Sequence, residues 1–120
     1  MVQTRKIMND YELAQLDFQG VVAQFGGAYE RVALNDIVLL DVSAISFLAD
    51  TRPPLKMRRS VIACRITSHD NRSGKIVISK IWKYYDDGSS APEAGAEQID
   101  QNYFQKPVQQ RLDESDSLFE

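Results

Sequence analysis

Apolar residues three or four positions apart predict a helix over residues 10–25. Asn9 stands three residues before Glu12, which is the spacing of a capping box with Asn in place of Ser or Thr. Gly26 and Gly27 follow as a natural C-terminal stop. The apolar stripe consists of Tyr11, Ala14, Phe18, Val21, Val22 and Phe25.

Part of the same segment also alternates in the manner of a strand. Leu16, Phe18 and Val22 lie two or four positions apart, and Gly20 costs a helix interior about 1 kcal/mol relative to Ala. A strand over residues 16–25 would make the domain mainly β, in the form of a small OB-like barrel. The length of the helical pattern and its caps favour the helix, so the barrel is the alternative fold.

The following segments predict strands. Residues 31–34 and 37–42 form a strand, turn, strand pattern, and the second run is almost continuously apolar, which is typical of a strand covered on both faces. Residues 60–67 and 75–85 are rich in β-branched and aromatic residues and are joined by a polar stretch that ends in Gly74. This pattern predicts a prominent β-hairpin.

Composition changes after Gly88. Residues 1–88 hold 12 Lys and Arg against 10 Asp and Glu, whereas residues 89–120 hold 2 against 7. The second part is also sparse in apolar residues and begins with a linker-like run of small residues. The sequence therefore predicts an α+β domain over residues 10–88, made of an N-terminal helix and a small antiparallel sheet. Residues 1–9 are expected to be a flexible N-terminus and residues 89–120 a flexible acidic tail.

Catalytic and metal-binding patterns are not evident in the sequence. Cys64 and His69 are the single cysteine and the single histidine, and Cys64 lies in the middle of a predicted strand, where a small buried side chain is expected. The chain has no metal-ligand spacing and no phosphate-binding loop. We therefore expect a non-enzymatic protein without a metal or another cofactor.

Location is predicted from three features. No apolar run approaches the roughly 20 residues that cross a bilayer, and the N-terminus lacks the apolar core of a signal peptide. A lone cysteine gives no internal disulfide. These features indicate a cytoplasmic protein that does not bind membranes.

Basic residues precede the hairpin, and residues 80–85 interleave two lysines with three aromatic residues. Bases stack on such rings for about 1–3 kcal/mol each, while Lys and Arg follow the phosphates. Trp82 and Tyr84 also share a strand face with Ile76 and Ile78, so a place in the core is the competing interpretation. The predicted single-stranded nucleic-acid surface comprises Arg52, Lys56, Arg58, Arg59, Lys80, Trp82, Lys83, Tyr84 and Tyr85.

The last nine residues mix acidic and apolar side chains. A β-rich body, a flexible linker and such a terminus together resemble the arrangement of bacterial single-stranded DNA-binding proteins, whose acidic tip recruits partner proteins. This chain departs from that family because it ends in Glu120 and because its body carries no motif of the family. The resemblance implies a partner-binding role for Leu112, Asp113, Glu114, Asp116, Leu118 and Phe119.

Two functions follow as hypotheses. The first is a single-stranded DNA- or RNA-binding accessory protein whose tail recruits other proteins. The second is a protein–protein adaptor, or an assembly subunit of a larger complex, that does not bind nucleic acid. A domain of roughly 80 residues has a modest core, so association with itself or with a larger partner is also expected to add stability.

Overall fold

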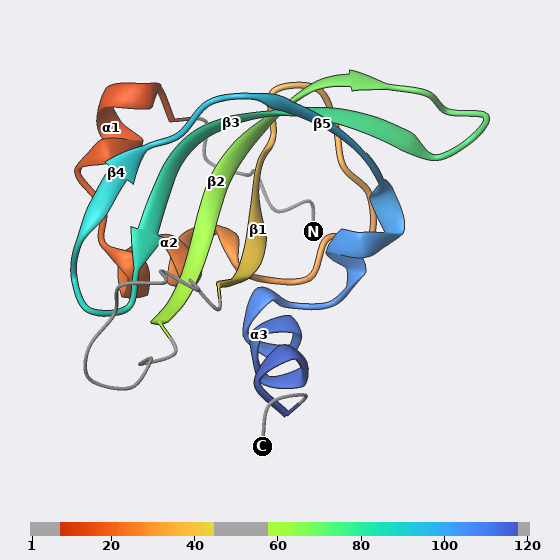
Figure 1. The fold of residues 1–120 in the computed structure, drawn as a ribbon. Coiled ribbons are helices and arrows are strands. Elements are labelled where there is room, and N and C mark those ends of the chain that lie inside the picture. Colours follow the sequence, from red (N-terminus) through yellow and green to blue (C-terminus); the bar gives the residue numbers. More distant parts are fainter. Residues whose placement is uncertain (1–7, 45–57, 118–120) are drawn as a thin grey trace.

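The computed structural model describes residues 8–44 and 58–117, which form three α-helices and an antiparallel sheet of five strands (Figure 1). The strand order is β1-β2-β3-β4, and β5 pairs with β3 beside β4. None of the helices in these residues is long and apolar enough to cross a membrane. The elements are α1 (Asp10–Ala14), α2 (Phe18–Phe25), β1 (Ile37–Ala44), β2 (Arg58–His69), β3 (Lys75–Tyr85), β4 (Ser90–Pro92), β5 (Ala96–Asp100), the 3-10 helix η1 (Gln101–Gln105) and α3 (Val108–Ser117).

The predicted α+β class is confirmed, and the sheet is not closed into the alternative barrel. The single helix predicted over residues 10–25 is wrong in one respect, because it is divided into α1 and α2. Asp17 causes the division: its backbone is extended and its carboxylate accepts a hydrogen bond from the Gly20 amide, which begins a second helix. The Asn9–Glu12 capping box at the start of α1 is confirmed.

The predicted hairpin is confirmed as β2 and β3, which pair antiparallel from Ser60 and Tyr85 to His69 and Ile76. The register shifts between Ala63 and Cys64 and again after Ile66. Such irregularities increase the twist of a strand pair. The hairpin consequently curves and extends beyond the body of the sheet (Figure 1).

Both faces of the sheet bear apolar clusters. We call the cluster that includes residues of α1, α2 and α3 the helix-side core, and the cluster on the opposite face the far-side core. Ile37 and Leu39 of β1 belong to the helix-side core, while Val38 and Leu40 belong to the far-side core. The prediction that this strand is covered on both faces is therefore confirmed.

The expected separation of the chain after Gly88 is wrong for residues 90–112. β4 and β5 hydrogen-bond to β3, and Phe104, Val108 and Leu112 are buried. Phe104 belongs to the far-side core, whereas Val108 and Leu112 belong to the helix-side core. Residues 118–120 of the predicted tail, like residues 1–7 of the predicted flexible N-terminus, lie outside the described residues. The sheet thus depends on a segment that the composition predicts to be a linker.

Candidate functional site

The predicted aromatic surface is largely internal. Tyr84 is fully buried in the helix-side core, and its hydroxyl donates a hydrogen bond to the Leu13 carbonyl. Burial raises the pKa of the Tyr84 phenol well above its usual value. Trp82 is partly buried against the same core, and its Nε1 is enclosed without a hydrogen-bond partner in the described part of the chain. Tyr84 therefore cannot offer its ring to a base in this fold.

The cationic residues predicted beside those rings are dispersed. Lys80 Nζ lies 3.4 Å from a carboxylate oxygen of Glu97, and Lys83 Nζ lies 5.1 Å from the centre of the partly exposed Tyr85 ring. Arg59 Nη2 lies 3.1 Å from Asp113 Oδ1, on the neighbouring helix α3. Arg52 and Lys56 lie outside the described residues, as does the side chain of Arg58. The described cations are thus divided among separate ion pairs and ring contacts.

The predicted partner-binding residues fall into two groups. Leu112 is buried in the helix-side core, and Asp113 and Glu114 lie on the exposed side of α3. Lys106 and Gln110 donate hydrogen bonds to Glu114, and these bonds hold the pKa of that carboxyl below its usual value. The side chain of Asp116 and both Leu118 and Phe119 lie outside the described residues. Leu112 therefore stabilises the fold and is not displayed for a partner.

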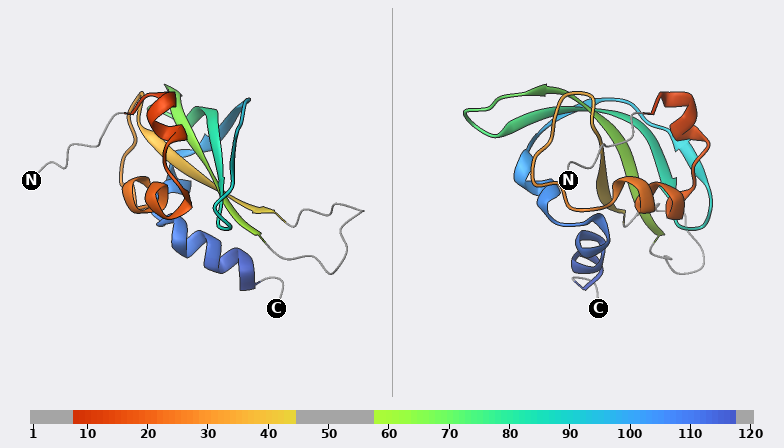
Figure 2. Two further views of the ribbon diagram at one scale, coloured as in Figure 1. Left: turned by 90° about the vertical axis from the view of Figure 1, so that its left-hand side faces the viewer. Right: turned by 180° about the vertical axis from the view of Figure 1, so that it is seen from behind.

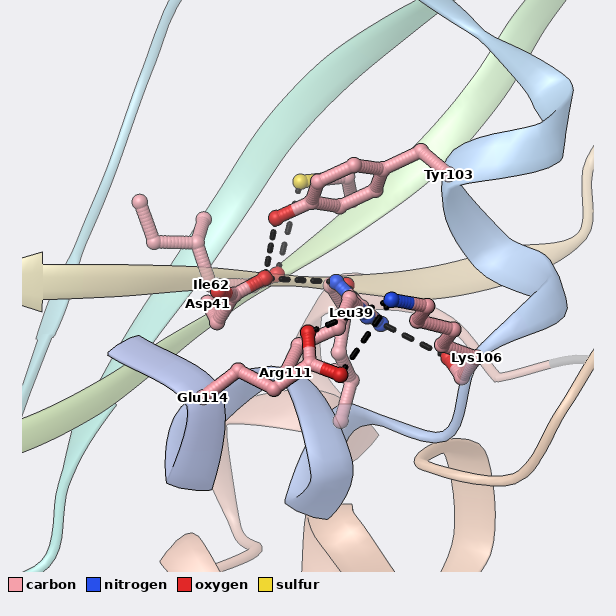
Figure 3. Close-up of polar contacts among 8 residues, drawn as sticks. Leu39, Asp41, Ile62, Tyr103, Lys106, Arg111 and Glu114 are labelled. Atoms are coloured by element: carbon pink, nitrogen blue, oxygen red, sulfur yellow. Dashed lines mark hydrogen bonds and ion pairs between the residues drawn. The ribbon is translucent and has the colours of Figure 1, made fainter. Parts of the chain in front are cut away.

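A buried polar cluster joins α3 to β1 (Figure 3). Arg111 Nη1 donates a hydrogen bond of 2.7 Å to Asp41 Oδ1, and its Nη2 donates one of 3.0 Å to the Leu39 carbonyl. The guanidinium lies 4.4 Å from the centre of the Tyr103 ring, whose hydroxyl also donates to Asp41. Burial, reinforced by the bond to Asp41, raises the pKa of Tyr103 to about 12. Because these polar groups are satisfied by one another, the cluster is a structural tie.

Cys64 and His69 do not form a catalytic pair. Cys64 is fully buried, and burial raises the pKa of its thiol to about 12, even though Lys80 acts in the opposite direction. The His69 Nε2 lies 3.2 Å from Gln101 Oε1 at the base of the hairpin loop. A nucleophile requires the thiolate form and access to substrate. Cys64 has neither.

We expect Cys64 to be inert towards a thiol reagent such as Ellman's reagent in the native protein at pH 8 and to react fully in denaturant. Stability should also fall above about pH 9, because the unfolded thiol ionises while the folded thiol keeps its proton until about pH 12. Cys64→Ala should flatten this dependence by up to about 1.4 kcal/mol per pH unit in that window. Urea unfolding from pH 8 to 10.5 measures the slope, and an unchanged slope would contradict the burial assigned to the thiol.

The β1 edge of the sheet is covered at Ile37 and Leu39. Its pairing with β2 directs the backbone groups of Ile37 and Leu39 away from the sheet. The Tyr29 hydroxyl donates to the Ile37 carbonyl at 2.7 Å, and Arg111 donates to the Leu39 carbonyl. Covering of this kind prevents another chain from pairing with an edge strand.

The opposite edge, formed by β4 and β5, is only partly protected. Pro92 occupies an outward-facing position of β4 and has no amide hydrogen to offer. The chain then bulges between Glu93 and Gly95, whose backbone groups pair with Ile81 and Lys80. β5 follows with no proline and continues as the edge of the sheet, on the side away from α1 and α2 (Figure 2, left). The outer edge of β5 is therefore the best candidate for a binding site among the described residues.

A second feature is an open hollow of about 260 Å³ between α2 and the turn after β3. Asp17, Asp86 and Asp87 line it with Phe18. Asp17 caps α2, and Asp87 accepts two hydrogen bonds from Ser89, so both carboxylates have structural roles. The described residues contain no group of three or more potential ligands placed to hold a metal ion.

Comparisons with known proteins give no relative: no family model, no curated protein and no solved structure matches this chain.

β5 and its outer edge are not among the elements predicted from the sequence. The available signal was the alternation in residues 96–100, where Glu97 and Ile99 share one strand face and Ala96, Gln98 and Asp100 share the other.

Proposed function

We propose that this protein is a protein-binding adaptor or assembly subunit. The observation that carries the proposal is the open outer edge of β5. The opposite edge of the sheet, β1, is covered at Ile37 and Leu39, and the adjoining edge strand β4 contains a proline. An extended segment of another protein can add to such an edge through main-chain hydrogen bonds. Pairing with β3 and packing of Ile99 against the far-side core hold β5 in its extended form before a partner binds.

The nucleic-acid hypothesis has less support from the described residues. Single-stranded nucleic acid needs several exposed rings beside a continuous basic groove. Tyr84 is in the core, and at least six described cations lie within 4 Å of a carboxylate oxygen. Five residues of the predicted set are partly exposed in the described part of the chain: Arg59, Lys80, Trp82, Lys83 and Tyr85. Arg59 and Lys80 already contact carboxylates, which leaves Lys83 and Tyr85 with part of Trp82. These three residues are too few to bind along a strand of nucleic acid.

Two experiments test the proposal. Labelled single-stranded DNA and RNA are titrated at about 50 mM and 200 mM salt while the fluorescence of Trp82 is followed, and we expect no binding tighter than about 100 μM. In parallel, selection from a random linear-peptide library displayed on phage is expected to enrich sequences that bind with micromolar affinity. Micromolar, steeply salt-dependent binding of an oligonucleotide, with Trp82 quenched and no peptide enriched, would overturn the proposal in favour of nucleic acid.

A further inference from the structure

The backbone of β5 has a defined set of outward-facing groups. The Lys80 amide bonds to the Gly95 carbonyl and the Gln101 amide to the Gly74 carbonyl, which fixes the alternation of inward- and outward-facing residues between them. Glu97 and Ile99 therefore bond to β3. The amides and carbonyls of Ala96 and Gln98 face outward, as does the Asp100 amide.

These outward-facing groups are accessible. Ala96 and Gln98 are exposed, and the structure gives their outward backbone groups no hydrogen bond within the described residues. The outward-facing residues of a strand are two positions apart, which is about 6.8 Å at the usual strand rise. The amides and carbonyls of an added antiparallel or parallel strand have the same spacing and can pair with them.

The charge around this edge identifies the partner. Residues 90–105 contain three carboxylates and no Lys or Arg, although lysines are what commonly protect an edge strand. Glu97 and Asp100 remain 49% and 43% exposed beside Lys80 and Lys75, at oxygen–nitrogen distances of 3.4 and 3.7 Å. The local charge is therefore negative on balance. A strand bearing cations would meet complementary charge, whereas the same edge of a second copy would bring carboxylates together.

We infer that β5 binds an extended segment of a partner protein that carries Lys or Arg, as an additional strand of the sheet. This inference rests on the proposed protein-binding function and names its partner chemistry. Glu97 and Ile99 lie on one face of β5, and Ile99 packs against the far-side core. The partner residue beside Glu97 is accordingly basic, and the residue two positions away, beside Ile99, is apolar.

The test uses two capped nine-residue peptides in which every second residue is Thr and the residues between them alternate between Val and either Lys or Glu, so that one strand face carries the charged and apolar residues in turn. Calorimetric titration of the full chain should give a dissociation constant at least tenfold lower for the Lys peptide at about 50 mM salt. Hydrogen exchange should show slower exchange of the Ala96 and Gln98 amides in the complex. The amide of Glu97, already bonded to β3, should change least.

Gln98→Pro separates strand addition from simple charge attraction. Proline at this position removes an outward amide but no bond to β3, so the sheet is retained, as circular dichroism will check. We expect the affinity for the Lys peptide to fall about tenfold. This change corresponds to the loss of one hydrogen bond between β5 and the peptide and to the steric effect of the proline ring, which keeps the peptide backbone away from β5. Gln98→Thr keeps the amide and is the matched control, with an affinity within about threefold of the parent.

Three results would overturn the inference: equal affinity for the Lys and Glu peptides, unchanged affinity in the proline variant, or unchanged exchange of the two outward amides. Dimerisation of the chain that Gln98→Pro abolishes, without peptide binding, would instead assign the edge to a second copy. If phage selection enriches peptides that bind the proline variant equally well, the protein-binding function stands and only the assignment to β5 fails.

Discussion

A chain that ends at Gly88 is expected to lose cooperative unfolding. This truncation removes β4 and β5, so that β3 becomes an uncovered edge, and it removes the buried Phe104, Val108 and Leu112. Each buried apolar side chain of this size contributes about 1.5–3 kcal/mol. Their sum is comparable to the whole net stability of a small domain, about 5–15 kcal/mol.

The measurement is urea unfolding followed by far-ultraviolet circular dichroism, with binding of a hydrophobic dye as a second reading. The truncated chain should show a broad, non-cooperative change and strong dye binding without denaturant. A chain that ends at Ser117 retains all the described elements and is the control, with a cooperative transition. A sharp transition at the parental midpoint in the shorter chain would restore the domain boundary to Gly88.

The parts of the fold that sequence reasoning identified are those in which the signal is local. The β2–β3 hairpin is a dense run of β-branched residues around a polar loop, and both strands lie next to each other in the chain. The first four residues of β1, from Ile37 to Leu40, are all apolar because they are packed alternately into the two cores. In each case the residues themselves indicate the environment that surrounds them.

The failures have physical reasons as well. Asp17 lies on the polar face of the helix predicted over residues 10–25, where an acidic residue is ordinary. Its hydrogen bond from the Gly20 amide identifies it as an N-cap, and the sequence does not show that bond. β4 and β5 resemble a linker because their side chains are mostly exposed, while their contribution to the sheet comes from the backbone. Amino-acid composition does not predict a strand that is stabilised mainly by backbone hydrogen bonds.

The C-terminal segment did contain a usable signal. Val108 and Leu112 are spaced four residues apart on α3 and are both buried in the helix-side core, whereas Phe104 lies in η1 and belongs to the far-side core. Two apolar residues at helical spacing are weak evidence for a buried face, and the acidic character of the segment outweighed them. The pairing of Arg111 with Asp41, by contrast, joins positions 70 residues apart and has no signature in a single sequence.

The tie between Arg111 and Asp41 is expected to be the most sensitive polar contact that the structure describes. The two side chains are 8% and 10% exposed, and Arg111 also donates to the carbonyls of Leu39 and Lys106. Arg111→Met leaves the Asp41 carboxylate buried without its cation, for which the usual cost is about 3–5 kcal/mol. If this variant does not fold, Arg111→Lys keeps the charge, loses the guanidinium fork and should be destabilised by a smaller, measurable amount.

A double-mutant cycle separates the pair from its surroundings. Asp41→Leu and Arg111→Met should each destabilise strongly, and the double variant should be more stable than the sum predicts by about 1–3 kcal/mol, because neither charge is then left alone. Glu114→Gln is the control: it removes the carboxylate of the exposed Lys106–Glu114 pair on the same helix and should cost at most about 1 kcal/mol. Strict additivity in urea unfolding would mean that α3 is held to β1 by its apolar residues, Val108 and Leu112, and not by the ion pair.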